Sequence, residues 1–131
     1  MVVDTSALVA IVLGETDAET FLAALRGSAD PVHLSATSAV ETAIVVEARQ
    51  GPDAARDLAL LVDGLGISVQ PVDPDQVPIA VAAWRRFGKG RHPAALNLGD
   101  CFSYALARTL GEPLLFKGED FSQTDLASVL A

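Results

Sequence analysis

Four short apolar segments alternate with longer segments of helical periodicity along this chain, and this alternation is the strongest constraint on its fold. The apolar segments are Val2-Val3 and residues 31–35, 66–72 and 113–116. The helical segments between them are residues 7–13, 16–26, 36–50, 53–63, 75–87 and 97–110. Short strands separated by helices are typical of parallel sheets, because each parallel connection must cross the sheet. The pattern therefore predicts an α/β fold with a parallel sheet and right-handed crossovers.

The length of the chain, 131 residues, suits one domain, and no repeat, linker or low-complexity tract divides residues 1–131. Half of the residues are apolar, which excludes intrinsic disorder. Cys101 is the only cysteine, so an intramolecular disulfide is excluded and a reducing cytoplasm is the expected location. The longest apolar run, residues 7–13, is far shorter than the ~20 residues of a membrane span, so no membrane partner is expected.

Polar side chains at the starts of the helical segments indicate where helices begin. We expect Thr5 or Ser6 to cap the first helix, residues 16–19 to form a capping box, and Asp75 to cap the helix over 75–87. Trp84 continues the apolar spacing of that helix and is expected in the core. Cys101 is expected to be a small buried side chain.

Four acidic residues stand where the predicted topology would gather them at one edge of the sheet. Asp4 ends the first strand, and Asp120 follows the fourth strand directly. Glu41 lies in the second turn of the helix after the second strand, and Asp100 lies at the start of the helix that leads into the fourth. Because ligands of parallel sheets bind outside the carboxyl ends of the strands, we expect these carboxylates in one cleft.

Carboxylates that share a cleft repel one another, and a hard divalent cation would relieve the repulsion. Mg²⁺ prefers such oxygen ligands, and Mn²⁺ is a possible substitute. A metal-bound water is a strong nucleophile, and the metal stabilises the charge of a phosphodiester that undergoes in-line displacement. No His or Lys is placed as an obvious general base, so metal-assisted phosphoester hydrolysis fits better than acyl transfer.

Each acid also has a purely structural explanation. Asp4 could cap the following helix, Asp100 suits the first turn of a helix, where the dipole favours an acid, and Asp120 could belong to a turn. Glu41 is harder to explain in this way, because it lies within an apolar segment where an unpaired carboxylate is costly. The four acids together indicate a functional cleft more strongly than any one alone.

Four stretches of the sequence resemble the motifs of the PIN-domain family, and in particular its VapC-type toxin ribonucleases. These stretches are residues 1–10, Ser35-Ala36 followed by Glu41, residues 96–107 and residues 114–121. The resemblance extends over essentially the whole chain. It implies a three-layer α/β fold with a four-stranded parallel sheet flanked by helices, and the activity of a Mg²⁺-dependent endoribonuclease.

The resemblance also assigns roles to individual residues. Asp4, Glu41 and Asp100 match three family carboxylates that hold the metal, and Ser6 matches a polar residue that helps to position metal or water. Many relatives carry a further Asp where this chain has Gly118, so Asp120 is the expected fourth catalytic acid, with Glu119 as its alternative. The partners implied are an RNA substrate, a second copy of the chain in a homodimer, and a VapB-type antitoxin.

The net charge of −8 argues against a nucleic-acid partner, but the charges are unevenly distributed. The basic residues between positions 84 and 117 are Arg85, Arg86, Lys89, Arg91, Arg108 and Lys117, against the acids Asp100 and Glu112. We therefore expect RNA phosphates at Arg85, Arg86, Lys89 and Arg91. A solvated helix end, favoured by the dipole, is the structural alternative for the two adjacent arginines.

Two other functions remain open on the sequence. A non-catalytic interaction module with the PIN scaffold is possible, because Gly118 stands where relatives carry an acid. An aspartyl-phosphate phosphotransferase also begins with a strand that ends in Asp, but such enzymes generally carry a second Asp two residues later, where this chain has Ser6. The G-x-x-x-x-G-K-[ST] phosphate loop is absent from the sequence, which excludes a P-loop nucleotidase.

Overall fold

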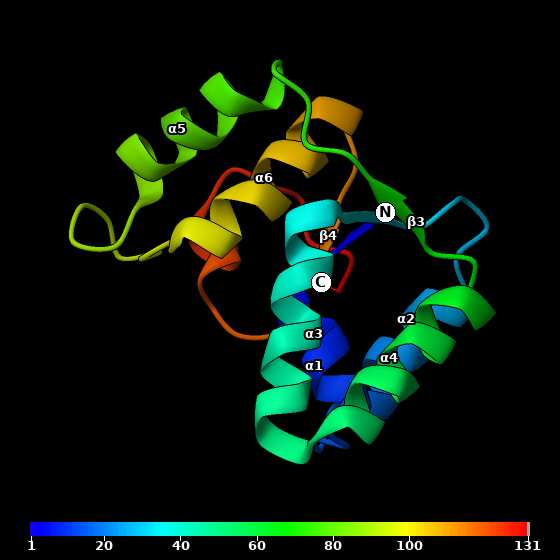
Figure 1. Ribbon diagram of the computed structural model, residues 1–131. Helices are drawn as coiled ribbons and strands as arrows, with labels where there is room; N and C mark the ends of the chain where they lie inside the picture. The colour runs from blue at the N-terminus through cyan, green and yellow to red at the C-terminus, as the bar shows by residue number, and fades with distance from the viewer. Residues whose placement is uncertain (131) are drawn as a thin grey trace.

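A computed structural model describes residues 1–130, and in this part of the chain six α-helices surround a four-stranded sheet (Figure 1). The strands are β1 (Val2–Val3), β2 (His33–Ser35), β3 (Ser68–Gln70) and β4 (Leu114–Leu115). The helices are α1 (Thr5–Val12), α2 (Ala18–Arg26), α3 (Ala36–Gln50), α4 (Pro52–Gly64), α5 (Gln76–Phe87) and α6 (Leu98–Leu110), followed by the 3₁₀ turn η1 (Phe121–Gln123). Every strand and helix that the sequence pattern predicts is present.

The sheet is parallel throughout, with the strand order β3-β2-β1-β4. Val2 is in register with His33 of β2 on one side and with Leu114 of β4 on the other. The first strand of the chain is therefore an inner strand, and the residue that follows it, Asp4, emerges between the ends of its neighbours. This topology brings acids from distant parts of the sequence to one edge.

Successive residues of β1 and β4 point to opposite faces of the sheet and enter two separate hydrophobic cores. Val3 and Leu115 pack with side chains of α1, α2 and α4. Val2 and Leu114 pack instead with side chains of α5 and α6. Helices thus cover both faces of the sheet, which confirms the expected three-layer α/β arrangement.

Helix caps differ from the sequence prediction at α1. The cap is Asp4 itself, whose side chain accepts a hydrogen bond from the backbone N–H of Ser6 at 3.0 Å. Neither Thr5 nor Ser6 is the capping residue, because the helix already begins at Thr5. The structural explanation for Asp4 is therefore correct, and it does not exclude the functional one, since a carboxylate has two oxygens.

The capping box expected at residues 16–19 is absent from α2, and Asp75 is the N-cap of α5, as expected, but its side chain makes no capping bond. At α2 the N-cap is Asp17, whose side chain makes no capping bond; it lies 3.2 Å from the Nζ of Lys117. At α5 the Asp73 carboxylate accepts the backbone N–H groups of Asp75 and Gln76, at 2.9 and 3.3 Å. In the first case a tertiary ion pair replaces the local bond, and in the second an Asx turn forms two residues earlier.

Two expectations about burial have opposite outcomes. Cys101 is buried, as expected. Trp84 is 44% exposed, so its expected place in the core is wrong. The apolar face of α5 is wider than the part that the core covers, and its outer side chains line an open hollow.

None of the helices in residues 1–130 is both long and apolar enough to cross a membrane.

Candidate active site

An open cleft of about 390 Å³ lies beside the carboxyl end of β1, between α1, α3 and the start of α6. Its acidic lining residues are Asp4, Glu15, Glu41 and Asp100. Three of these are the acids that the sequence assigned to a common cleft, and their convergence follows from the parallel topology. Glu15 is an addition that the sequence patterns did not indicate.

Asp4 is the most firmly held of these carboxylates. It is 3% exposed, and each of its oxygens accepts a short hydroxyl hydrogen bond. Ser103 Oγ donates to Oδ1 at 2.6 Å, and Ser6 Oγ donates to Oδ2 at 2.6 Å. The backbone N–H of Lys117 in turn donates to Ser6 Oγ at 3.0 Å, which links the end of β4 to this carboxylate. Ser6 thus orients Asp4, and its expected role in positioning metal or water stays a prediction.

Ser103 is a site residue that the sequence analysis missed. It lies on α6, is fully buried, and its hydroxyl is 3.1 Å from that of Ser38 on α3. The Ser103 hydroxyl donates its only hydrogen to Asp4, so in the contact between the two serines the Ser38 hydroxyl is the donor and Ser103 Oγ is the acceptor. This chain of hydroxyls ties α3 and α6 to the end of β1, and it fixes the direction in which Asp4 points.

Asp100 lies at the start of α6, where it forms a capping box with Asn97. Its Oδ2 accepts the Asn97 N–H at 3.0 Å, and its own N–H donates to Asn97 Oδ1 at 2.9 Å. Burial raises the pKa of Asp100 from 3.8 to about 7; the bond from the Asn97 backbone opposes this rise, and the charges of Asp4, Asp120 and Glu41 add to it. The four predicted acids therefore share one electrostatic field.

The fourth acid is placed differently from the other three. Asp120 is exposed at the start of η1 and does not line the cleft, although its charge contributes to the raised pKa of Asp100. Glu119 lines a separate hollow beside Gly118 and Lys117. Gly118 has a φ of +96°, a backbone conformation that L side chains rarely adopt. The turn after β4 thus favours glycine at position 118.

Two cationic side chains line the same cleft. Arg49 lies on the face of α3 that also carries Glu41 and Val45, at intervals of four residues. Lys117 Nζ is 2.5 Å from Glu15 Oε1, and this hydrogen bond raises the pKa of Lys117. Arg49 was missed by the sequence analysis, although its helical spacing from Glu41 could have indicated it.

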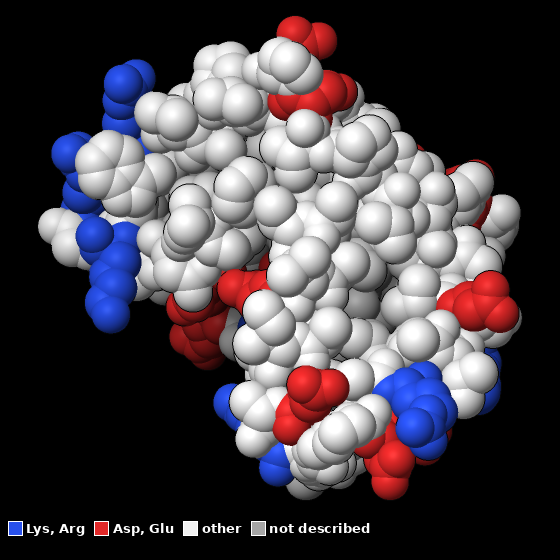
Figure 2. Space-filling model, viewed as in Figure 1, with Lys and Arg blue, Asp and Glu red and all other residues white. Residues whose placement is uncertain are grey.

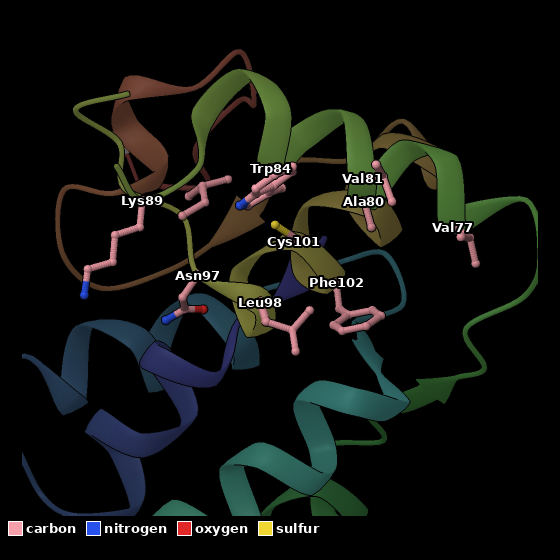
Figure 3. Close-up of a pocket in the computed structure, with 10 residues that line it drawn as sticks. Val77, Ala80, Val81, Trp84, Lys89, Asn97, Leu98, Cys101 and Phe102 are labelled. Atoms are coloured by element: carbon pink, nitrogen blue, oxygen red, sulfur yellow. The ribbon is translucent and has the colours of Figure 1, made fainter. Parts of the chain in front are cut away.

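The predicted RNA-contacting residues gather at the far end of α5, where Figure 2 shows a group of blue side chains at the left edge. Arg91 lies over the Trp84 ring at 4.2 Å, and Arg86 pairs with Asp125 at 3.2 Å. Lys89 and Asn97 line one hollow together, and Asn97 also lines the acidic cleft (Figure 3). The basic end of α5 therefore adjoins the carboxylates through Asn97.

The cleft offers a hard cation suitable donors but not a complete set of protein ligands. Within residues 1–130, no three His, Cys, Asp or Glu side chains are close enough to hold one ion between them. Mg²⁺ typically keeps several waters and binds through one or two carboxylates, which is what Asp4 and Asp100 with neighbouring Glu41 can supply. Burial and then the neighbouring carboxylates raise the pKa of Asp100, and a bound cation would favour its ionised form.

Comparison with known proteins agrees with this geometry. The sequence profile of the PIN domain matches residues 1–126. The chain is 52% identical over 130 residues to ribonuclease VapC30 of Mycobacterium tuberculosis, with 98% of both chains covered. It is 53% identical to ribonuclease VapC of Mycolicibacterium smegmatis, with 98% of this chain and 99% of the relative covered.

A solved structure supports the fold independently. The crystal structure of M. tuberculosis VapC20, a toxin that cleaves the sarcin-ricin loop, superposes with a TM-score of 0.80 at 23% identity. The superposition covers 96% of this chain and 95% of VapC20. With the profile match and the two closely similar sequences, it leads to one conclusion: the chain belongs to the PIN-domain family and, within it, to the VapC group.

Proposed function

We propose that this chain is the toxin of a VapB–VapC-type toxin–antitoxin pair, a metal-dependent endoribonuclease that hydrolyses RNA phosphodiester bonds in the cytoplasm. The observation that carries the proposal is the pair of short hydroxyl hydrogen bonds that hold Asp4 beside Asp100 and Glu41. A buried carboxylate fixed at both oxygens is what a site needs when its ligands must not move during the reaction.

Each residue of the cleft has a distinct task in this reaction. Asp4 and Asp100 hold the metal, with Glu41 as the third carboxylate, and Mg²⁺ is the proposed ion, with Mn²⁺ as a substitute. When bound, the ion supplies an activated water and stabilises negative charge on the phosphate. Ser6 and Ser103 keep the Asp4 oxygens in place. Asp120 is the proposed fourth acid, with Glu119 as its alternative, because the charge of Asp120 acts on Asp100.

RNA would reach the carboxylates along a path of positive side chains. Arg49 and Lys117 line the cleft itself, and Lys89 adjoins it through Asn97. Arg85 and Arg91 extend the path along the end of α5, whereas the ion pair between Arg86 and Asp125 leaves Arg86 less available. Phosphate contacts of this kind are independent of base sequence and are weakened by salt.

The homodimer is proposed to form through the face that carries α3, α5 and α6. Figure 2 shows few charged side chains on this face, with Lys and Arg at its edge. Its exposed apolar side chains are Val40, Ile44, Val77, Val81 and Leu98. A hollow of about 510 Å³ lies between α5 and α6 in this face, with Trp84 and Leu98 in its wall (Figure 3). Such an apolar face suits a second protein chain better than RNA.

A VapB-type antitoxin is the second proposed protein partner. The chain carries a net charge of −8, and its cleft is lined by four carboxylates. A basic segment of the antitoxin would be attracted to this cleft and would compete there with metal and RNA.

The two other candidate functions are less well supported. A phosphotransferase would use an Asp4 oxygen as its nucleophile and would generally carry a second Asp two residues later, but this chain has Ser6 there, and its hydroxyl donates a hydrogen bond to Asp4. A non-catalytic module could keep Asp4 as the N-cap of α1, but it would neither bind Mn²⁺ nor cleave RNA.

The proposal is tested by incubating the purified protein with structured and single-stranded RNA, with Mg²⁺ or with excess EDTA. We expect cleavage with Mg²⁺, none with EDTA, and a loss of at least ~100-fold in Asp4→Asn, because even residues that only orient metal ligands contribute roughly 10–100-fold. Asp53→Asn, on exposed α4, is the control. Equal cleavage by Asp4→Asn and the parent would overturn the proposal.

A further inference from the structure

Glu41 is packed against the backbone of α6 at Gly99, the residue that precedes Asp100. A Cβ atom built on Gly99 would collide with Glu41 Oε2 and would lie 2.8 Å from Glu41 Cδ. These contacts are much shorter than those that Cβ atoms make in proteins, so the Glu41 carboxylate occupies the space that any side chain at position 99 would need.

The backbone of α6 gives no other reason for a glycine at this position. Gly99 is the second residue of α6 and does not have a positive φ. Alanine is a much better helix former than glycine, so local preference favours alanine at this site. Gly99 therefore makes α6 less stable than alanine would, and it leaves the space that the Glu41 carboxylate occupies.

The carboxylate of Glu41 has no other restraint in the described chain. Its oxygens accept no hydrogen bond from residues 1–130, in contrast to the two fixed oxygens of Asp4. The start of a helix favours a nearby anion, and Glu41 lies there beside Asp100. The bare backbone at Gly99 is therefore what permits Glu41 to approach.

We propose that Gly99 is a positioning residue, whose missing side chain lets the Glu41 carboxylate come close to the ion held by Asp4 and Asp100. The proposal rests on the metal site described under the proposed function. A methyl group at position 99 would displace Glu41, and the displacement would cost little because the Glu41 side chain is flexible and unrestrained. Loss of metal affinity is then expected without loss of folding.

The test compares Gly99→Ala with the parent by calorimetric titration of Mn²⁺ and by urea unfolding in EDTA. We expect the Kd for Mn²⁺ to rise about 10–100-fold, as for other residues that orient metal ligands. We expect the urea midpoint to stay unchanged or to increase. Gly64→Ala is the matched control, because Gly64 lies in helix α4 with no atom near its added Cβ; this variant should bind Mn²⁺ as the parent does.

A double-mutant cycle with Glu41→Ala separates positioning from packing. Gly99→Ala should weaken Mn²⁺ binding when Glu41 is present and should have no effect when Glu41 has been replaced. Parent-like Mn²⁺ binding by Gly99→Ala would overturn the inference, and so would weak binding accompanied by a lower urea midpoint. Failure of the parent itself to bind Mn²⁺ would instead refute the proposed function.

Discussion

Replacing Ser103 with alanine is the most informative perturbation of the site, because it removes one oxygen atom and nothing else. The Ser103 hydroxyl is fully buried and donates to Asp4 Oδ1 at 2.6 Å. Its loss leaves a carboxylate oxygen without a donor in a position that is only 3% exposed. It also deprives the Ser38 hydroxyl, 3.1 Å away, of its acceptor.

The expected cost follows from these contacts. A hydrogen bond to a charged group contributes about 1.5–3 kcal/mol, so Ser103→Ala should lower the free energy of unfolding by roughly 2–3 kcal/mol. With a typical dependence of ~1–3 kcal/mol per molar urea, the unfolding midpoint should fall by about 1 M. RNA cleavage should fall by roughly 10–100-fold, because Asp4 loses one of its two orienting bonds.

Urea unfolding in EDTA, followed by circular dichroism, measures this cost. Ser28→Ala is the matched control, since it removes an exposed hydroxyl that donates to a neutral carbonyl, that of Asp30, at 2.7 Å; it should cost about 0.5 kcal/mol or less. A cost below ~0.5 kcal/mol for Ser103→Ala as well would show that this hydroxyl does not hold Asp4.

Three further predictions concern charge, association and titration. Arg49→Ala should weaken RNA binding and reduce the salt dependence of the binding constant by about one phosphate contact. Arg56→Ala, on α4, is the control and should change neither quantity. Equal effects of the two variants would show that Arg49 does not contact RNA. Ile44→Asp should convert a dimer to a monomer in light scattering, and the similarly exposed Leu60→Asp should not; a dimer in both would place the interface elsewhere. Tyr104, the only tyrosine, should titrate at about 12 by absorbance at 295 nm, because burial and its hydrogen bond to Asp125 raise its pKa above 10. The Tyr104 phenol ionises at a lower pH in the unfolded chain than in the folded one, so the free energy of unfolding should decrease as pH rises above about 10. Titration near 10 in the folded protein would contradict the hydrogen bond to Asp125.

The predicted architecture rests on features that are local in the sequence, which is why it could be inferred. The Val2-Val3 strand, its acid at position 4 and the helix after it are contiguous, and parallel pairing follows once helices separate the strands. The gathering of Asp4, Glu41 and Asp100 then follows from topology alone. The ambiguity between cap and site at Asp4 and Asp100 has a simple resolution: Asp4 caps α1, Asp100 belongs to the capping box of α6, and both residues line the cleft.

What the sequence could not provide are contacts between residues far apart along the chain. Ser103 meets Asp4 across 99 positions, and no periodicity within α6 distinguishes it from any other buried serine. Lys117 pairs with Asp17 in the same way, across 100 positions, and the Asp17 side chain makes no capping bond at α2. The exposure of Trp84 was missed for a different reason, since helical spacing identifies an apolar face but not whether that face is covered by the same chain.

Part of the acidity of the chain, which at first argues against an RNA partner, comes from the site itself, because four of the 17 acidic residues line the cleft. Burial and three neighbouring carboxylates raise the pKa of Asp100 to about 7, so the cleft resists full ionisation without a counter-ion. A divalent cation offsets that charge, and Arg49 remains available for phosphate, whereas Lys117 is paired with Glu15 and Asp17. Metal binding and RNA binding are therefore expected to reinforce each other.

Diffraction from crystals soaked in Mn²⁺ and measured near the manganese absorption edge would test the metal site most directly. We expect an anomalous peak in the cleft, at roughly 2.0–2.3 Å from an oxygen of Asp4 or Asp100, with Glu41 beside it. The peak should disappear in crystals of Asp4→Asn. A fully soaked crystal with no peak in the cleft, or with manganese bound only at exposed acids such as Asp53, would contradict the assignment of Asp4, Glu41 and Asp100 as a metal centre.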